Sequence, residues 1–353
     1  MKVLLITPKE EFPTGGIATW TNNYLSYAIN NGLDCDIVNT VLVGDRAKNS
    51  SAKRNVLDEY KRTKNIFKQL NGFLKNNNYN VAHLNTSCGL FGIIRDYFIA
   101  KKIKKRNIKV VTQYHCDIPN FITNKISKWF LKKLAKLSDV NFVLCQNSAN
   151  FLLNQCQAQS VIIPNFINDD YIINEDKPIS PSIQNVFFVG RISKAKGMVE
   201  LYSVANKFPN VNFVLAGVIS EEMLNVEKPK NVITLGAVNR ELVSKYLDEA
   251  DVFLFPSYSE GFSMALLEAM ARGVPSIATN VGANADMLED KGGCVVEVKN
   301  VELIVSAMET LSSYDKRKEA SSWCVSKVKN NYTLTKVMAK ICAKYIKEEL
   351  AKI

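Results

Sequence analysis

Two glutamates eight residues apart, Glu260 and Glu268, lie in the largely apolar segment 251–286. Glu260 falls in a turn closed by Gly261, and Glu268 falls on the helix that the following residues predict. A carboxylate among core leucines costs free energy unless it has a polar partner, so we expect Glu268 to be paired rather than to be an ordinary surface residue. Because a carboxylate accepts two hydroxyl hydrogen bonds at once, it suits the diol of a ribose or a hexose.

A second group of chemically useful residues follows the apolar run 186–189. Gly190 ends this run, and Arg191 and Lys196 come after it in a predicted loop before a helix. At the carboxyl end of a strand, a guanidinium fork and an ammonium can together neutralise a diphosphate. Basic residues in such loops are more often ordinary surface residues. Arg191 and Lys196 therefore indicate a binding site only if the two glutamates belong to the same site.

The pair Gly15 and Gly16 follows the first apolar run, 2–7, and precedes a helical pattern over 17–31. Glycines between a strand and a helix let the backbone approach a ligand and direct amide groups at an anion. The spacing is not that of the dinucleotide fingerprint G-x-G-x-x-G, and no acidic residue cleanly ends the second strand. A nicotinamide-dependent enzyme is therefore disfavoured.

Residues that commonly hold metals are few. The only two histidines, His83 and His115, belong to no H-E-x-x-H motif, so we expect no metal site. Asp34 and Asp36 form a D-x-D pair, but they flank the predicted second strand, where carboxylates at a solvated strand edge are the favoured interpretation. His83 lies inside an apolar run and is expected to be a core imidazole. His115 lies just past a strand end, where ligands of α/β proteins bind.

These residues must be positioned by two series of short apolar runs separated by helix-compatible stretches. The runs are 2–7, 36–38, 81–84, 110–112, 141–144 and 161–163, and then 186–189, 212–215, 232–235, 251–255, 276–279 and 293–296. Such alternation predicts an α/β protein with two doubly wound parallel sheets in tandem, facing each other across a ligand cleft. The polar segment 168–184, with Pro178 and Pro181, is interpreted as the linker between them.

Length, composition and charge narrow the function classes. With 353 residues, 47% of them apolar, the chain is long enough for two globular domains and is not biased towards disorder. Its net charge of +11 comes from the first 165 residues, where 23 Lys and Arg outnumber 10 Asp and Glu; the later counts are 22 and 24. The basic half predicts an anionic partner, lipid or nucleic acid, unless it serves only solubility. No aromatic-rich strand or recognition-helix motif supports nucleic acid.

The cysteines and the N-terminus indicate the compartment. The eight cysteines form no C-x-x-C motif, and we expect them to be scattered buried thiols in a reducing cytosol. The first twelve residues contain an apolar run too short for a secretory signal, and no run is long enough to cross a membrane. We therefore expect the protein to stay in the cytoplasm.

One predicted helix, 121–137, is both basic and apolar. Its apolar arc contains Ile122, Ile126, Trp129, Phe130, Leu134 and Leu137. Lysines lie beside this arc, and Lys133 intrudes on it. Such a helix can lie on a membrane surface or can pack into the core with a cationic outer face, and the pattern leaves both open. The run 101–109, with six cations in nine residues, favours an anionic lipid surface.

Taken together, these motifs resemble the GT-B glycosyltransferases, specifically the large retaining group with an E-x7-E signature (glycosyltransferase family 4, glycosyl transferases group 1). The resemblance covers almost the whole chain. It rests on Gly15 and Gly16, His115, 163–165, Gly190 and Arg191, Lys196 and Gly197, 235–238, and above all 250–282.

The resemblance implies two Rossmann-like domains with different ligands. An acceptor-binding domain would span 1–167 plus a C-terminal helix at about 335–353, and a nucleotide-sugar domain would span 168–334. By this resemblance, Arg191 and Lys196 would bind the diphosphate, Glu268 the ribose, Glu260 the donor hexose and Val238 the base. The amides of Phe262, Ser263 and Met264 would line the sugar and the phosphates. Gly16, with Gly15, would approach the phosphates from the other domain, and His115 would lie near the transferred sugar and the acceptor. His115, Glu260, Arg191 and Lys196 would be the catalytic set.

The function that the resemblance implies is a retaining, metal-independent transfer of a hexose or N-acetylhexosamine. The donor would be a nucleotide-diphosphate sugar, with a UDP-sugar favoured and no other cofactor. The acceptor would be an oligosaccharide or a lipid-linked glycan in cell-surface polysaccharide synthesis, used in the cytoplasm or at the inner face of the cytoplasmic membrane. An alternative is a non-catalytic GT-B subunit that activates a partner enzyme, which the presence of both glutamates and both cations disfavours.

Overall fold

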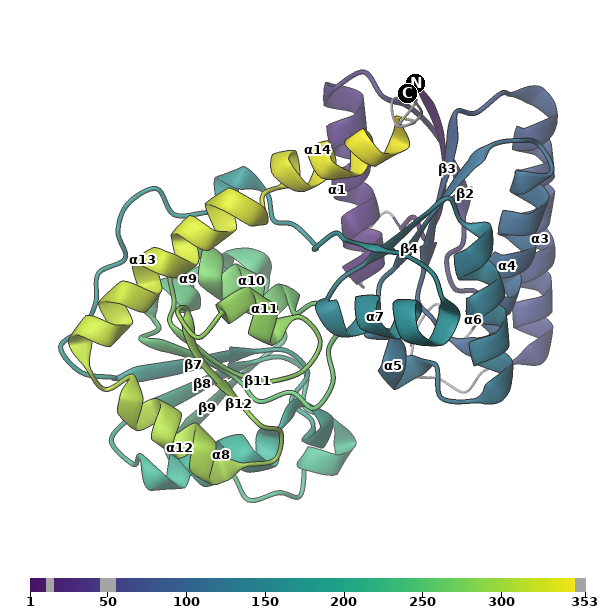
Figure 1. Cartoon of the computed structure of the whole chain (residues 1–353). Coiled ribbons are helices and arrows are strands. Elements are labelled where there is room, and N and C mark those ends of the chain that lie inside the picture. The colour runs from purple at the N-terminus through teal and green to yellow at the C-terminus, as the bar shows by residue number, and fades with distance from the viewer. Residues whose placement is uncertain (11–15, 45–54, 347–353) are drawn as a thin grey trace. The chain divides into compact units, whose positions relative to one another are not determined.

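The chain divides into two compact units, which are shown in a computed structural model that describes residues 1–10, 16–44 and 55–346 (Figure 1). Unit 1 comprises Met1–Asn165 and Leu334–Ile353, and unit 2 comprises Phe166–Thr333. The boundaries predicted from the sequence, at 167/168 and 334/335, lie within two residues of these. Each unit contains one sheet, and each is described by itself below.

Unit 1 is built on a six-stranded parallel sheet in the order β2-β1-β3-β4-β5-β6. The strands are β1 (Lys2–Thr7), β2 (Asp34–Asn39), β3 (Val81–Thr86), β4 (Lys109–Tyr114), β5 (Val140–Val143) and β6 (Val161–Ile162). The helices are α1 (Gly16–Asn30), α3 (Val56–Asn76), α4 (Leu90–Lys104), α5 (Ile118–Phe121), α6 (Lys125–Leu137), α7 (Gln146–Phe151) and α14 (Leu334–Tyr345). The run Leu152–Cys156 is a π-helical turn.

The two faces of this sheet have different cores because successive strand residues point to opposite sides. In β3, Ala82 and Leu84 join the apolar cluster beneath α3, α4 and α6. His83, between them, points to the other face, where its ring lies 5.4 Å from that of Trp20 on α1 and 5.7 Å from that of Tyr345 on α14. Figure 1 shows α1 and α14 on one side of the sheet and α3, α4 and α6 on the opposite side.

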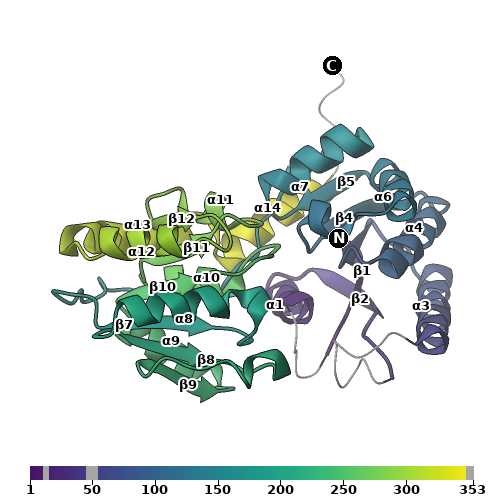
Figure 2. The same ribbon diagram turned by 90° about the horizontal axis from the view of Figure 1, so that it is seen from below.

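Unit 2 repeats the design with a second six-stranded parallel sheet, in the order β12-β11-β10-β7-β8-β9. Its strands are β7 (Asn185–Val189), β8 (Asn212–Ala216), β9 (Val232–Gly236), β10 (Val252–Phe255), β11 (Ser276–Thr279) and β12 (Gly293–Val296). Its helices are α8 (Met198–Lys207), α9 (Arg240–Glu249), α10 (Met264–Ala271), α11 (Asn284–Leu288), α12 (Val301–Thr310) and α13 (Tyr314–Asn331). Figure 1 shows α8 and α12 below this sheet and α9, α10 and α13 above it, and Figure 2 shows it from below. The predicted α/β class with two parallel sheets is confirmed.

The basic helix begins later than predicted. The chain forms the short helix α5 (Ile118–Phe121) and then α6 (Lys125–Leu137), which starts after Asn124 because the Asn124 side chain accepts a hydrogen bond from the amide of Ser127 at 2.8 Å. The predicted apolar arc is also divided. Leu134 is buried in the core, whereas Ile126 and Trp129 are 59% and 53% exposed.

The segment 168–184 is not a linker between the units, contrary to the prediction, because it belongs to unit 2. The amide of Ile173 donates to the carbonyl of Ala271 at 3.1 Å. The fully buried guanidinium of Arg317 donates to the carbonyl of Ser180 at 2.6 Å. Burying a guanidinium costs free energy that hydrogen bonds offset, and this segment supplies one acceptor, the carbonyl of Ser180. The prolines therefore lie in a docked segment.

The expectation of thiols alone is wrong for two of the eight cysteines. Cys88 follows β3 and Cys116 follows β4, and their sulfurs form a disulfide in the described structure. Both residues are buried. The other cysteines are free thiols. Since Cys116 directly follows His115, the disulfide ties the loop of the predicted catalytic histidine to the end of β3.

None of the helices in the described residues is both long enough and apolar enough to traverse a bilayer.

Candidate active site

In unit 2, two glycines hold the loop of Glu260 in place. Gly197 has φ +73°, and a Cβ there would collide with the carbonyl of Pro256, so the turn at Lys194–Lys196 packs directly against the chain that follows β10. Gly282 has φ +56°, and a Cβ there would lie 2.5 Å from the carbonyl oxygen of Glu260. Only glycine adopts such backbone conformations without strain and allows such close approach. Three loops therefore meet at the carboxyl edge of this sheet.

This meeting of loops brings two predicted site residues into contact. The Lys196 ammonium forms an ion pair with the Glu260 carboxylate, and the two side chains are 28% and 14% exposed. The Lys196 ammonium also lies 5.4 Å from the centroid of the Phe255 ring. The amide of Tyr258 donates to the carbonyl of Ala195 at 2.9 Å, which joins the two loops through their backbones. The cation and the acid are thus neighbours although 64 residues separate them.

Arg191 lies on the same loop as Lys196 and is exposed. Its neighbours are fixed, because Ile192 is fully buried and its amide donates to the carbonyl of Val218 at 2.9 Å. Within residues 1–10, 16–44 and 55–346, Arg191 forms no ion pair. Its guanidinium can therefore meet an anion without first losing a carboxylate partner.

The start of α10 presents amide groups that no side chain caps. Ser263 is the N-cap residue, but its hydroxyl donates to the side-chain oxygen of Asn284 at 2.5 Å instead of accepting from its own helix. In the described part of the chain, the amides of Phe262, Ser263 and Met264 donate no hydrogen bond. Phe262 is buried and packs edge-on against Tyr332, with ring centroids 5.7 Å apart. Free amides at a helix N-terminus attract anions.

Glu268 lies one turn further along α10 and is half-buried, so it is neither a core residue nor a freely solvated one. Burial raises the pKa of Glu268, and the positive charge of Arg240 acts in the opposite direction. Arg240, the first residue of α9, is therefore the cation that acts on this carboxylate. Its guanidinium lies 4.5 Å from the centroid of Tyr171. Sequence reasoning did not single out Arg240 or Tyr171, although Arg240 stands only two residues after Val238.

Val238 is half-buried in the loop between β9 and α9. The next residue, Asn239, caps α9 by accepting a hydrogen bond from the amide of Leu242 at 2.9 Å. This cap fixes where α9 starts, and so where Arg240 points relative to Val238. Val238 thus lies two residues before Arg240, the cation that acts on Glu268.

In unit 1, His115 stands directly after β4, at the carboxyl end of the strand. Its amide donates to the carbonyl of Thr86 at 2.9 Å, and its Nε2 lies 3.0 Å from the side-chain oxygen of Asn85. Because an amide oxygen can only accept, Nε2 carries the proton and Nδ1 carries the lone pair. Burial lowers the pKa of His115 to about 3, so the imidazole is neutral at physiological pH.

A directional chain of hydrogen bonds holds this tautomer. The Asn85 amide nitrogen donates to the hydroxyl of Thr7 at 3.0 Å, and the hydroxyls of Thr7 and Thr21 are 2.6 Å apart. The Thr21 hydroxyl donates to the carbonyl of Ile17 on α1 at 2.9 Å, so it accepts from Thr7. Each polar group in this chain is used once. Sequence reasoning missed Asn85, Thr7 and Thr21 because each is an ordinary strand or helix residue in its own segment.

Gly16 is the first residue of α1 and is exposed. Among the described residues, no atom lies within 4 Å of the position that a Cβ would take there. The role that the resemblance implies for Gly16 stays a prediction. Gly15, the other member of the pair, lies outside the described residues.

The prediction that His83 is a core imidazole is confirmed, because His83 is fully buried. Its Nδ1 lies 2.5 Å from the hydroxyl of Tyr345, and that hydroxyl is 3.1 Å from the hydroxyl of Tyr24. Burial lowers the pKa of His83 to about 3. Its role is to anchor α14 to the sheet.

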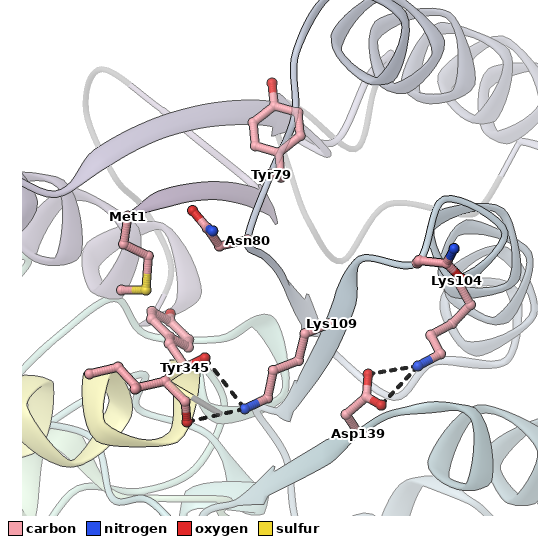
Figure 3. A pocket seen from close by; sticks show the side chains of 9 residues that line it. Met1, Tyr79, Asn80, Lys104, Lys109, Asp139 and Tyr345 are labelled. Carbon is pink, nitrogen blue, oxygen red and sulfur yellow. Dashed lines mark hydrogen bonds and ion pairs between the residues drawn. The ribbon is translucent and has the colours of Figure 1, made fainter. Parts of the chain in front are cut away.

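A cavity of about 790 Å³ lies at the opposite, amino-terminal edge of the unit 1 sheet (Figure 3). Lys104 in its wall forms an ion pair with Asp139 at 2.8 Å, and the Lys109 ammonium donates to the carbonyl of Lys344 at 2.7 Å, near the end of α14. These cations already serve the fold. Asp34 and Asp36 lie at this edge too, 3.6 and 3.2 Å from the Lys2 ammonium, as expected for a strand edge. The cavity is therefore separate from the carboxyl edge where His115 lies.

No group of three or more His, Cys, Asp or Glu residues that could hold a metal ion occurs in the part of the chain that the structure describes.

Comparison with known proteins places both halves of the chain. Residues 14–171 match the family described as Glycosyltransferase Family 4, and residues 172–322 match Glycosyl transferases group 1. An uncharacterized 41.2 kDa protein in the cps region of Klebsiella pneumoniae is 27% identical over 337 residues, which cover 87% of this chain and 90% of that protein. The 2-deoxystreptamine N-acetyl-D-glucosaminyltransferase of Niallia circulans is 30% identical over 249 residues, 62% of each protein.

A shorter match and two solved structures complete the comparison. The UDP-Gal:alpha-D-GlcNAc-diphosphoundecaprenol alpha-1,3-galactosyltransferase of Escherichia coli is 27% identical over 151 residues, 40% of this chain and 38% of that protein. Sucrose-phosphate synthase of Thermosynechococcus elongatus has a TM-score of 0.79 at 14% identity and covers 98% of both chains. HepE of Anabaena in complex with UDP has a TM-score of 0.69 at 14% identity, over 98% of this chain and 99% of that one. These structures share the fold, and with the two family matches they show that the chain belongs to the GT-B glycosyltransferases.

Proposed function

We propose that this protein is a retaining, metal-independent hexosyltransferase. It moves a hexose or an N-acetylhexosamine from a nucleotide-diphosphate sugar to a glycan acceptor, in the synthesis of a cell-surface polysaccharide on the cytoplasmic side of the membrane. The observation that carries the proposal is the contact between Lys196 and Glu260 beside the uncapped amides of 262–264. At one edge of the sheet, a cation and free amides suit the diphosphate of an activated sugar, and an acid suits the hydroxyls of that sugar.

The charges of unit 2 support the reaction. When the bond between the sugar and the diphosphate breaks, negative charge develops on the leaving diphosphate, and preorganised donors stabilise it. Arg191, Lys196 and the amides of 262–264 supply these donors, so the proposal assigns no step to a metal. Glu260 accepts hydrogen bonds from hydroxyls of the transferred sugar. In a retaining reaction the acceptor hydroxyl attacks the face from which the diphosphate leaves.

Glu268 and Val238 support a nucleotide rather than a simple phosphate ester as donor. The carboxylate of Glu268 suits a ribose diol, and Val238 borders the place where the base would lie. A UDP-sugar is the favoured donor. HepE, which shares the fold, is described in complex with UDP.

His115 supports a hydroxyl acceptor. Its neutral imidazole keeps Nδ1 unprotonated, so it can accept a hydrogen bond from a sugar hydroxyl but cannot repel a cation or attract the diphosphate. The acceptor is an oligosaccharide or a glycan linked to a lipid diphosphate. The matched Escherichia coli enzyme is named for an acceptor of the second kind.

Donor use can be tested directly with the purified full chain. Thermal unfolding is measured with UDP-, GDP- and ADP-sugars, since a ligand at a hundred times its dissociation constant stabilises by about 2.7 kcal/mol. Hydrolysis or transfer of the stabilising donor is then followed, and the anomeric configuration of the product is read by NMR. Glu260→Gln should abolish turnover. Glu289→Gln, which removes the acid of a different ion pair in unit 2, Lys327–Glu289, should not.

Three outcomes would contradict the proposal in whole or in part. Turnover that survives Glu260→Gln would remove Glu260 from the site. A chain that uses no donor but raises the turnover of a separate glycosyltransferase on mixing would be the non-catalytic subunit instead. An inverted product would refute retention alone.

A further inference from the structure

The outer surface of α4 and α6 carries a cluster of aromatic side chains, here termed the α4–α6 face. Tyr97 and Phe98 on α4 meet Trp129 and Phe130 on α6, with ring centroids of Trp129 and Phe130 4.7 Å apart and those of Tyr97 and Phe130 5.6 Å apart. Phe98 is 47% exposed and Trp129 is 53% exposed. Ile126, one turn before Phe130, is 59% exposed.

The core of unit 1 does not need these side chains. Helix α6 buries Leu131, Leu134 and Ala135 against the apolar cluster under the sheet, and α4 buries Ile99 and Ile103 in the same cluster. The cluster on the α4–α6 face lies on the other side of both helices. A contiguous group of exposed aromatic and aliphatic side chains on a folded domain marks a surface that binds another apolar surface, such as a membrane or a protein.

The charge around this cluster has one sign. Residues 97–138 contain eleven Lys and Arg and one acidic residue, Asp117, which is buried. Asp139, the next acid along the chain, is paired with Lys104. The exposed cations are Lys101, Lys105, Arg106, Lys125, Lys128, Lys133 and Lys136. The Lys133 ammonium lies 5.4 Å from the centroid of Trp129, so cation and aromatic ring share one surface.

The aromatic part of the face has a fixed place in the fold. Helices α4 and α6 follow β3 and β4, so both begin at the carboxyl edge of the sheet, where His115 lies. Ile126 and Trp129 are in the first half of α6, and the lysines continue to its far end. Ile126 and Trp129 therefore lie nearer the His115 edge of the sheet than the C-terminal end of α6 does.

We propose that the α4–α6 face docks on an anionic lipid bilayer. Phe98, Ile126 and Trp129 enter the interfacial layer, and the surrounding lysines meet the anionic head groups. The same cations would repel a second copy of this surface. Exposed Ile126 has no use in binding nucleic acid, where aromatic stacking and phosphate contacts act. A bilayer satisfies both the apolar side chains and the charges.

This docking goes beyond the proposed reaction and does not depend on it, because vesicle binding needs no donor or acceptor. If the reaction is also as proposed, docking holds the His115 edge close to the head-group layer, where a lipid-linked glycan is presented. The two proposals can therefore fail separately.

The experiment is sedimentation of the full chain with vesicles. One set contains phosphatidylglycerol and phosphatidylcholine in equal parts, and the other contains phosphatidylcholine alone. We expect binding to the anionic vesicles that weakens as salt is added. The variant Ile126→Ser/Trp129→Ser should lower this binding by at least about tenfold, since it removes the inserted side chains. The matched control Ile29→Ser changes an 80% exposed residue on α1, and its binding should not change.

A parallel pair of variants tests the charges. Lys133→Gln/Lys136→Gln should weaken binding at low salt and reduce its salt dependence, whereas Lys228→Gln/Lys230→Gln, at exposed positions of unit 2, should do neither. Thermal unfolding of all four variants should match that of the unmodified chain, since every changed side chain is largely exposed.

Quenching of tryptophan fluorescence by acyl-brominated lipids locates the contact. Of the three tryptophans, Trp20 is 3% exposed and Trp323 belongs to unit 2, so Trp129→Phe should remove most of the quenching while binding persists. Equal binding to both vesicle types, or quenching that survives Trp129→Phe, would overturn the proposal. Tight oligonucleotide binding without vesicle binding, or a dimer that the Ile126→Ser/Trp129→Ser variant dissociates, would assign the face to another partner.

Discussion

The carboxyl edges of the two sheets are built from opposite kinds of chemistry. In unit 2 the edge is charged, with Arg191, Lys196, Glu260 and Glu268. In unit 1 the part of the edge at His115, here called the neutral edge, holds the imidazole by uncharged groups, through the hydrogen bond to Asn85 and an edge-on contact with the ring of Trp20. The difference matches a division of tasks, since a leaving diphosphate needs compensating charge and an attacking hydroxyl needs orientation.

Burial follows the same division. Burying a charged group costs hydration, and Lys196 and Glu260 keep 28% and 14% of their side-chain surface exposed. The neutral relay can be buried, and Thr7, Thr21 and Asn85 are 0 to 3% exposed. A charged edge can therefore adapt to its ligand, whereas the neutral edge is fixed before the ligand arrives.

The largest expected effect concerns the charged edge. Lys196→Ala removes a cation from the diphosphate and leaves Glu260 without its partner, so kcat/KM should fall by about a thousandfold. Steady-state kinetics with the nucleotide sugar that the thermal-unfolding panel selects measure this loss. Lys327→Ala, which breaks the ion pair with Glu289, is the control and should leave kcat/KM unchanged. A loss below tenfold for Lys196→Ala would mean that this edge does not hold the diphosphate.

A smaller effect is expected for the neutral edge. Asn85→Ala frees the His115 ring and should lower kcat by about a hundredfold without changing the KM for the donor, because misplacing a reacting group by about 1 Å has effects of this size. Nitrogen chemical shifts of His115 should change from a single tautomer to a mixture. Asn141→Ala removes a buried amide at the other edge of the same sheet and should alter stability but not the tautomer. A change in donor KM would instead couple Asn85 to the charged edge.

The buried histidines make unit 1 sensitive to acid. The pKa of His83 is about 3 in the folded chain and about 6.5 in the unfolded chain, so the unfolded state binds the proton first as the pH falls. Between pH 6.5 and pH 5 the free energy of unfolding should therefore decrease by about 2 kcal/mol, with a smaller part from His115, which is partly exposed. Urea unfolding of the full chain at several pH values measures this slope. His83→Gln should flatten it, and an unchanged slope would contradict the assignment.

The smallest effect is expected at the ribose. Glu268→Gln should raise the KM for the donor by about tenfold with little change in kcat, because the lost hydrogen bonds exist in both the ground state and the transition state. Burial raises the pKa of Glu268, so its carboxylate becomes protonated early when the pH is lowered. As the pH falls, donor affinity should therefore be lost at a higher pH than it would be with an ordinary carboxylate. Affinity is measured by thermal shift across pH. Glu268→Gln should remove the pH dependence, and a variant that retains it would place the titrating group elsewhere.

The sequence predicts the charged edge far better than the neutral one. Arg191, Lys196 and Glu260 are charged residues in the loops that follow β7 and β10, and Glu268 is a charged residue on the apolar helix α10, so local pattern is informative for all of them. Thr7, Thr21 and Asn85 are ordinary residues of β1, α1 and β3, and only the folded sheet brings them together. The same holds for Arg240 and Tyr171, which lie 69 residues apart, and for the disulfide of Cys88 and Cys116. Long-range partners leave no local signal.

The basic helix shows where periodicity is insufficient. The pattern over 121–137 contains an apolar arc, but it does not say which part of the arc faces the sheet. Asn124 ends the preceding turn and sets the phase of α6, so that Leu134 is buried and Trp129 is exposed. The spacing of apolar residues alone therefore does not tell which of them pack against the sheet, and the capping residue supplies that information.

The anchoring of α14 sets an order in which the molecule can be built. Tyr345 supplies the hydroxyl that pairs with buried His83 and lies beside Tyr24, yet it is made some 260 residues after His83. During synthesis from the amino end, residues 166–333 are therefore complete while the first domain still lacks its last helix. Unit 1 therefore gains the hydroxyl that His83 meets in its core only after the whole of unit 2 has been translated.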